Sequence, residues 1–143
     1  MKNEVSQAKK HRFHSRDLAE IAIGACVMAF PIAVTEEVWK LGEELSLTRA
    51  LLFAFASMMF LGVFIYFLYE HAGHPVSRKI FLQRVASTYF VTFLICAILL
   101  FGIDRVDFLN EPFIALKRTI LVAFPASFAA TVVDSFSPRA DRH

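Results

Sequence analysis

The sequence lacks the short motifs that carry most enzymatic chemistry. It contains no metalloprotease zinc helix, no phosphate-binding glycine loop, no dinucleotide-binding fingerprint and no nucleophile elbow. Cysteine is scarce: Cys26 and Cys96 both fall in apolar stretches, where free thiols act as small packing residues and a disulfide framework is implausible. We therefore expect neither an enzyme nor a cofactor.

Charge is missing from long parts of the chain, and this absence excludes a soluble domain. The 143 residues are 57% hydrophobic and include 16 phenylalanines, and the mean hydropathy is +0.54. A bilayer core of about 30 Å is crossed by about 20 helical residues, and four segments are that long: 18–39, 50–69, 80–103 and 112–134. The sequence predicts an all-α polytopic membrane protein with four transmembrane helices.

Lysine and arginine are distributed unevenly around these segments. Ten of them fall on the side that receives the basic arm (1–16), the second loop and the tail (137–143), and five fall on the other side. By the positive-inside rule both termini of the transmembrane domain (17–136) are predicted to be cytoplasmic. The basic arm is expected to contact anionic lipid headgroups rather than nucleic acid.

Small residues distinguish two of the predicted helices from the others. They recur three and four apart in the first helix (Ala22, Ala25, Cys26, Ala29, Ala33) and in the fourth (Ala123, Ala126, Ser127, Ala130). Such spacing lets membrane helices approach closely. We therefore expect these two helices at the centre, and the second helix, with phenylalanine nearly all round it, at the periphery.

Each central helix also carries a proline followed by acids. Pro31 precedes Thr35, Glu36 and Glu37, and Pro125 precedes Asp134. Proline removes a backbone donor and clashes with the preceding turn, so both helices are predicted to be kinked.

The acids at the end of the first helix permit two interpretations. Glu37, Glu36 and Thr35 are candidates for an ion-binding pore mouth, where an oligomer gathers carboxylates around an axis. Alternatively, Lys117 and Arg118 enter from the same face at a similar depth and act as counter-ions in structural salt bridges. The sequence does not separate the two interpretations.

Other polar residues are weaker candidates. Glu20 is predicted to pair with Arg84, and Asp134 either ends the fourth helix or binds an ion. His71 and His74 are three apart and weakly suggest a metal site, although the surrounding residues also suit an ordinary turn.

One phrase carries a family resemblance. Seven residues fit the pattern F-P-x-x-x-T-x-E-x-W-x-L-G: Phe30, Pro31, Thr35, Glu37, Trp39, Leu41 and Gly42. Here the chain resembles a family of bacterial integral membrane proteins, the domain of unknown function 2391. The resemblance implies a multi-spanning protein of the bacterial inner membrane, names no activity, and singles out Glu37 over Glu36.

Two functions are consistent with these observations. The first is a homo-oligomeric channel or small transporter for an inorganic ion such as a proton or a metal cation, with Glu37 at its outer mouth. The second is a non-conducting interaction or assembly protein whose intramembrane charges form structural salt bridges.

Overall fold

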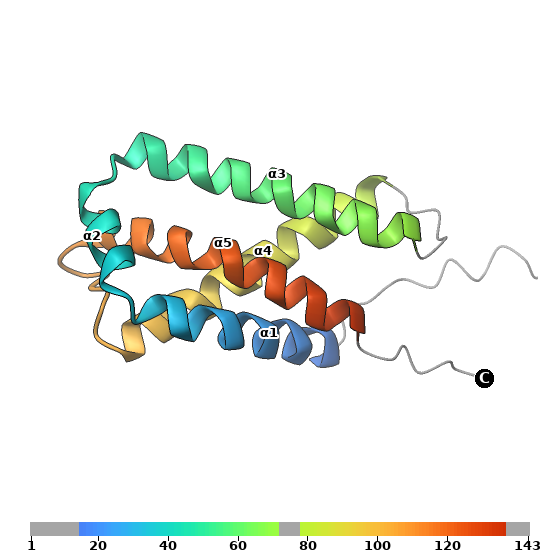
Figure 1. The fold of residues 1–143 in the computed structure, drawn as a ribbon, viewed down its shortest axis with the longest axis horizontal. Coiled ribbons are helices and arrows are strands. Elements are labelled where there is room, and N and C mark those ends of the chain that lie inside the picture. Colours follow the sequence, from blue (N-terminus) through green and yellow to red (C-terminus); the bar gives the residue numbers. More distant parts are fainter. Residues whose placement is uncertain (1–14, 72–77, 137–143) are drawn as a thin grey trace, which may run out of the picture.

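The computed structural model describes residues 15–71 and 78–136, which fold into five helices (Figure 1). These are α1 (Ser15–Ala33), α2 (Glu36–Glu44), α3 (Leu47–His71), α4 (Arg78–Gly102) and α5 (Pro112–Phe136). Within these ranges there is no strand. By length and composition α3, α4 and α5 can each cross a membrane, and α1 with α2 meets the same test as one bent pair. The predicted all-α polytopic membrane fold is confirmed.

The first predicted span is not one continuous helix. We expected a helix over 18–39, but α1 ends at Ala33 and α2 begins at Glu36, with an angle of 82° between them. Pro31 lies in the last turn of α1, where it removes a donor and crowds the preceding turn, and the chain leaves the helix shortly afterwards. Pro31 thus marks the end of a helix rather than a kink within one. In contrast, α5 continues through Pro125.

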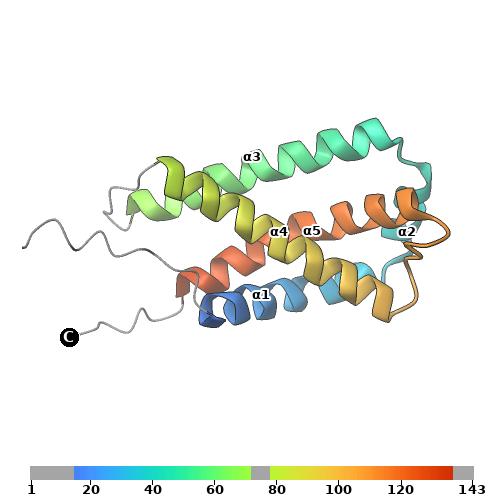
Figure 2. The ribbon, with the colours of Figure 1, turned by 180° about the vertical axis from the view of Figure 1, so that it is seen from behind.

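The fifth helix occupies the centre of the bundle. It packs against α1, α2, α3 and α4, and its pairing with α1 is the most extensive. The buried share of the membrane-crossing stretch is 50% in α5, 33% in α4 and 17% in α3, which places α3 at the periphery. The start of α1 and the end of α5 lie at one end of the bundle, and α2 lies at the other (Figures 1 and 2).

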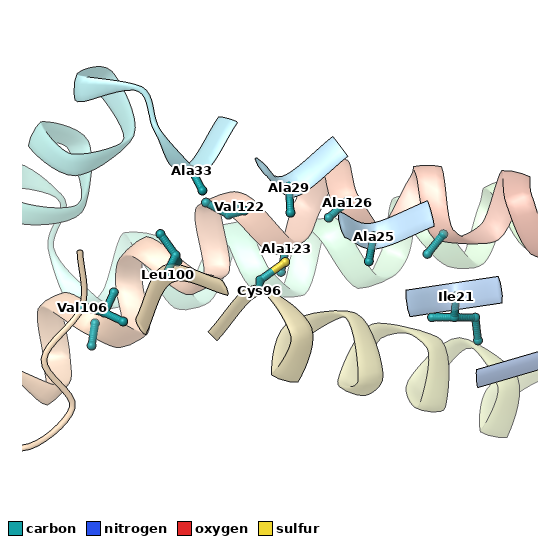
Figure 3. Packing of buried hydrophobic residues seen from close by; sticks show 12 residues of the cluster. Ile21, Ala25, Ala29, Ala33, Cys96, Leu100, Val106, Val122, Ala123 and Ala126 are labelled. Atoms are coloured by element: carbon teal, nitrogen blue, oxygen red, sulfur yellow. The ribbon is translucent and has the colours of Figure 1, made fainter. Parts of the chain in front are cut away.

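Small side chains line the contact between α1 and α5. Figure 3 shows Ala25 and Ala29 of α1 against Ala123 and Ala126 of α5, and all four are fully buried. A Cβ added at Gly24 would lie 2.7 Å from the Cα of Ala130, so the two backbones nearly touch. The small-residue stripes therefore bring α1 and α5 together as their spacing predicts. Cys26 is the exception, because it is exposed and does not pack in this contact.

The two cysteines differ in their surroundings. Cys96 is buried beside this contact, whereas Cys26 is exposed, and both thiols are free.

The phenylalanines of α3 serve two purposes. Phe55, Phe60 and Phe67 are exposed. Phe53 and Phe64 instead pack on two aromatic rings of α5, Phe124 and Phe128, with ring centroids 5.2 and 5.4 Å apart. The peripheral helix is thus attached to the central one through an aromatic seam.

Candidate functional site: the bend between α1 and α2

The bend satisfies the backbone carbonyls that the end of α1 exposes. The carbonyl of Ile32 accepts hydrogen bonds from the Thr35 amide (3.1 Å) and the Thr35 hydroxyl (2.8 Å). The carbonyl of Ala33 accepts one from the Trp39 indole Nε1 (2.7 Å). Unpaired carbonyls at a helix end are costly near hydrocarbon, so these bonds stabilise the break. Thr35, predicted as an ion ligand, is engaged with the backbone.

Trp39 is also held by the loop between α4 and α5. The guanidinium carbon of Arg105 lies 3.6 Å from the centroid of the tryptophan ring, a cation–π contact. Arg105 reaches this position through a turn after α4 that contains a left-handed residue, Asp104 (φ 57°). Two backbone bonds of 3.0 Å close the turn, from Arg105 N to Leu100 O and from Asp104 N to Phe101 O.

Glu36 and Glu37 do not continue the first helix but open the second one. Both are exposed in the first turn of α2, where the helix dipole favours acids. Glu36 pairs with Lys40 at 3.5 Å, and both side chains are more than 70% exposed. The prediction of one continuous helix through Glu36 and Glu37 is therefore wrong, because α1 ends at Ala33. The depth of the two acids relative to the membrane boundary stays a prediction.

Lys117 binds the opposite end of α2. Its Nζ donates to the carbonyl oxygens of Glu43 (3.2 Å) and Leu45 (2.9 Å), and the residue is only 8% exposed. These carbonyls lie at the negative end of the α2 dipole, which a cation stabilises. Lys117 is thus a helix cap and not the counter-ion of Glu36 or Glu37.

Arg118 joins three segments of the chain. It pairs with the Glu43 carboxylate (2.5 Å), and it donates to the carbonyl oxygens of Trp39 (3.3 Å) and Arg105 (2.6 Å). Gly42 makes room for it, because a Cβ there would lie 2.4 Å from the Arg118 Cγ. The predicted salt bridge thus exists with a different acid.

We call the set Trp39, Gly42, Glu43, Arg105, Lys117 and Arg118 the α2 clamp. Our sequence interpretation did not include Glu43 and Arg105. A signal was available for Glu43: once the helix is taken to end after Pro31, a second helix brings Glu43 to the same boundary as Arg118. No sequence signal places Arg105 over Trp39, because that contact depends on how the loop folds back.

A second ion pair lies at the other end of the bundle. Arg84 of α4 pairs with Asp134 of α5, and their side chains are 26% and 11% exposed. Arg84 thus engages an acid that we had expected to end the helix or bind an ion. The predicted pairing of Glu20 with Arg84 stays a prediction. Asp134 also does not end its helix, since α5 continues to Phe136. Glu20 is half-buried on α1.

Some predictions fall on parts of the chain that are not described. The basic arm (except its last residues), His74 and the tail lie outside the described ranges, and of His71 only the backbone is described. Within the described ranges, no three His, Cys, Asp or Glu residues form a group that could hold a metal.

Comparison with known proteins adds to this geometry. The profile of the integral membrane protein family DUF2391 matches residues 1–133. The chain belongs to the DUF2391 family. No curated protein and no solved structure matches it.

Membership explains the apolar exterior of this DUF2391 chain. Large side chains such as Phe55, Phe90 and Ile98 are more than 60% exposed on α3 and α4. On a soluble protein such a surface would mark a binding site or an aggregation risk. In an integral membrane protein these side chains contact lipid.

Proposed function

We propose that this DUF2391 protein is a non-conducting membrane protein that presents α2 to a partner protein. One observation carries the proposal: three cations of α4 and α5 are engaged within the chain, Lys117 by carbonyls, Arg118 by Glu43 and Arg84 by Asp134. An ion pathway needs polar groups that remain available to the ion. Here the buried charges hold helices together instead.

The exposed face of α2 supports the interaction part of the proposal. Glu36, Glu37 and Glu44 are exposed there and are accompanied by a single base, Lys40. Such a face suits a positively charged segment of another protein, because complementary potentials speed association and select partners.

A second candidate is the homo-oligomeric cation channel or small transporter. Glu37 favours it: this side chain is exposed, and among the described residues no ion pair or hydrogen bond engages it. Rotational symmetry would gather Glu37, Glu36 and Thr35 of several copies into a ring that binds a proton or metal cation. Pro31 and Pro125 would shape the path.

Ion flux into liposomes containing the purified protein separates the two candidates. The non-conducting proposal expects flux equal to that of empty liposomes at every pH tested. The channel candidate expects flux that falls in Glu36→Gln/Glu37→Gln protein and persists in Glu111→Gln, a control that removes an exposed acid from the nearby loop. Flux with that pattern of variants would refute the non-conducting proposal.

Photo-crosslinking in native membranes tests the interaction part. A crosslinker placed at Glu37 or Glu44 should capture one discrete protein of a different size, and one at Phe55 on the lipid-facing side of α3 should not. A ladder of the chain with itself from Glu37 would favour the oligomer instead. Equal, diffuse products from all three positions would contradict a specific surface on α2.

The remaining parts of the proposal concern location and chemistry. We place the protein in the bacterial inner membrane with both termini cytoplasmic, since ten of fifteen lysines and arginines lie on that side. We also propose that it is not an enzyme, because its sequence carries none of the catalytic motifs considered above.

A further inference from the structure

We infer that α2 is a surface-lying helix, held flat in the lipid headgroup layer where α1 leaves the hydrocarbon. The inference concerns lipid and does not rest on the proposed function. It begins with length: the apolar part of α1, Leu18–Ala33, extends about 24 Å, which is most of the hydrocarbon core of about 30 Å. The 9 residues of α2 extend only about 14 Å, too little to cross again. At 82° to α1, α2 runs along the membrane surface.

The faces of α2 match this placement. Glu36, Lys40 and Glu44 follow at four-residue spacing along one exposed face. On the opposite face Gly42 is buried and Val38 half-buried against the bundle. A helix lying across the end of a bundle directs one face into the membrane and the other away from it. The charged face is therefore the one that meets water.

An apolar edge lies beside the charged face. Leu41 is 44% exposed on α2, and Val34 is 46% exposed in the bend. Helices with charged and apolar sides of this kind lie in the plane of the interface, with the apolar side among the acyl chains. Leu41 and Val34 would supply that contact.

The charged residues of α5 locate the membrane independently. Asp134 follows Lys117 by seventeen positions, which corresponds to about 26 Å along the helix. The ion pair of Asp134 and Arg84 marks one boundary of an apolar slab, and Lys117 marks the other. Because Lys117 binds the carbonyls of Glu43 and Leu45, α2 lies level with the second boundary.

The positions of the exposed acids distinguish a surface-lying α2 from a re-entrant loop. A re-entrant helix would carry one of its ends back into the hydrocarbon. Exposed acids stand at both ends of α2, Glu36 and Glu37 at the start and Glu44 at the finish, and burying any of them in lipid is costly. Both ends therefore belong in the headgroup layer.

The single tryptophan of the unmodified chain provides the first test. In vesicles containing lipids brominated at different depths, emission from Trp39 should be quenched most by bromines nearest the headgroups. Strongest quenching by bromines near the bilayer centre, or quenching by aqueous iodide alone, would overturn the inference.

Cysteine labelling provides the second test and uses different substitutions. In a Cys26→Ala/Cys96→Ala background, Glu36→Cys and Glu44→Cys should react from the same side, at comparable rates, with a membrane-impermeant maleimide. Phe55→Cys, exposed on α3 within the apolar slab, should remain unlabelled. An unreactive Glu44→Cys, or one that reacts from the opposite side, would contradict a helix lying flat.

Discussion

Individual side chains determine how the first helix ends. Pro31 weakens the last turn of α1, and the hydroxyl of Thr35 and the indole of Trp39 then supply hydrogen-bond donors to the exposed carbonyls. A proline alone leaves a chain free to kink and continue. Here the donors beyond the proline stabilise the break in place of further helix.

Replacing Trp39 with phenylalanine should therefore destabilise the protein. The variant keeps an aromatic ring but removes the donor to the Ala33 carbonyl, and an unpaired buried carbonyl costs about 1–3 kcal/mol. Thermal unfolding in detergent should show a lower midpoint for Trp39→Phe. The exposed Tyr66→Phe is the control and should not shift it. Equal midpoints for all three proteins would show that the indole bond does not stabilise the bend.

Asp107 stabilises the turn before α5 in a pH-dependent manner. Hydrogen bonds from the side chain (2.5 Å) and the amide (3.1 Å) of Asn110, and from the amide of Leu109 (2.9 Å), lower its pKa below the ordinary value of 3.8. A carboxylate whose pKa is lowered by folding contributes its full stabilisation when the pH is above its pKa in the unfolded state. That contribution is lost as the pH falls through the lowered pKa.

Hydrogen exchange should detect this loss. Protection of the Leu109 and Asn110 amides should hold from pH 7 to about 4 and decline at lower pH. In Asp107→Asn it should be weaker and nearly independent of pH. The same decline in both proteins would assign the effect to another acid.

Pairs of helices show why glycine matters at some positions only. Gly24 lies against the backbone of α5, where an added Cβ would be 2.7 Å from the Ala130 Cα and 2.8 Å from the Ala129 carbonyl oxygen. Around Gly62, in the middle of α3, no atom of the described residues beyond its own helical turn lies within 4 Å of such a Cβ. Gly24 thus permits close contact between α1 and α5. Gly62 permits no such contact and only increases the conformational entropy that α3 loses on folding.

Alanine at these two glycines should have opposite effects. Gly24→Ala forces α1 and α5 apart and should lower the free energy of unfolding by about 1–3 kcal/mol or more. Gly62→Ala should raise it by about 0.5–1 kcal/mol through helix propensity. Chemical denaturation in mixed micelles would measure both values. If Gly24→Ala were as stable as Gly62→Ala, the close approach of α1 and α5 would be refuted.

For the whole molecule, Arg118 connects parts that are distant in the sequence. It binds α2 through Glu43 and Trp39, and the α4–α5 loop through Arg105, from a position on the central helix. A guanidinium group can donate in several directions at once, whereas an ammonium group acts as a compact point charge. The end of the bundle that carries α2 depends on this geometry.

Arg118→Lys should therefore loosen that end although charge is conserved. Losing hydrogen bonds to two carbonyls should cost about 2–3 kcal/mol, and Trp39 emission should move to longer wavelength as its surroundings become more polar. The exposed Arg49→Lys serves as a matched control and should leave both readings unchanged. Identical spectra and stabilities for the two variants would contradict the role of Arg118.

Much of the architecture could be predicted from local sequence. The uncharged segments of α3 and α4 can be stable in a bilayer only as helices. In hydrocarbon there is no water to bond the backbone, and a helix satisfies its backbone hydrogen bonds internally. The alanine stripe of α1 predicted its close contact with α5. The candidate site was harder, since the partners of Lys117 and Arg118 depend on the direction the chain takes after Ala33.

The sequence by itself therefore determined the membrane environment, the helical class and the small-residue contact between α1 and α5. These follow from hydrophobicity and residue size, which act locally along the chain. Only the tertiary structure decided that the acids after Pro31 lie on a separate helix, and that Glu43 rather than Glu37 meets Arg118. The physical reason is that the 82° turn changes which residues the charged side chains after it can contact. The contacts that hold this turn come from α5 and the α4–α5 loop, which are distant in the sequence.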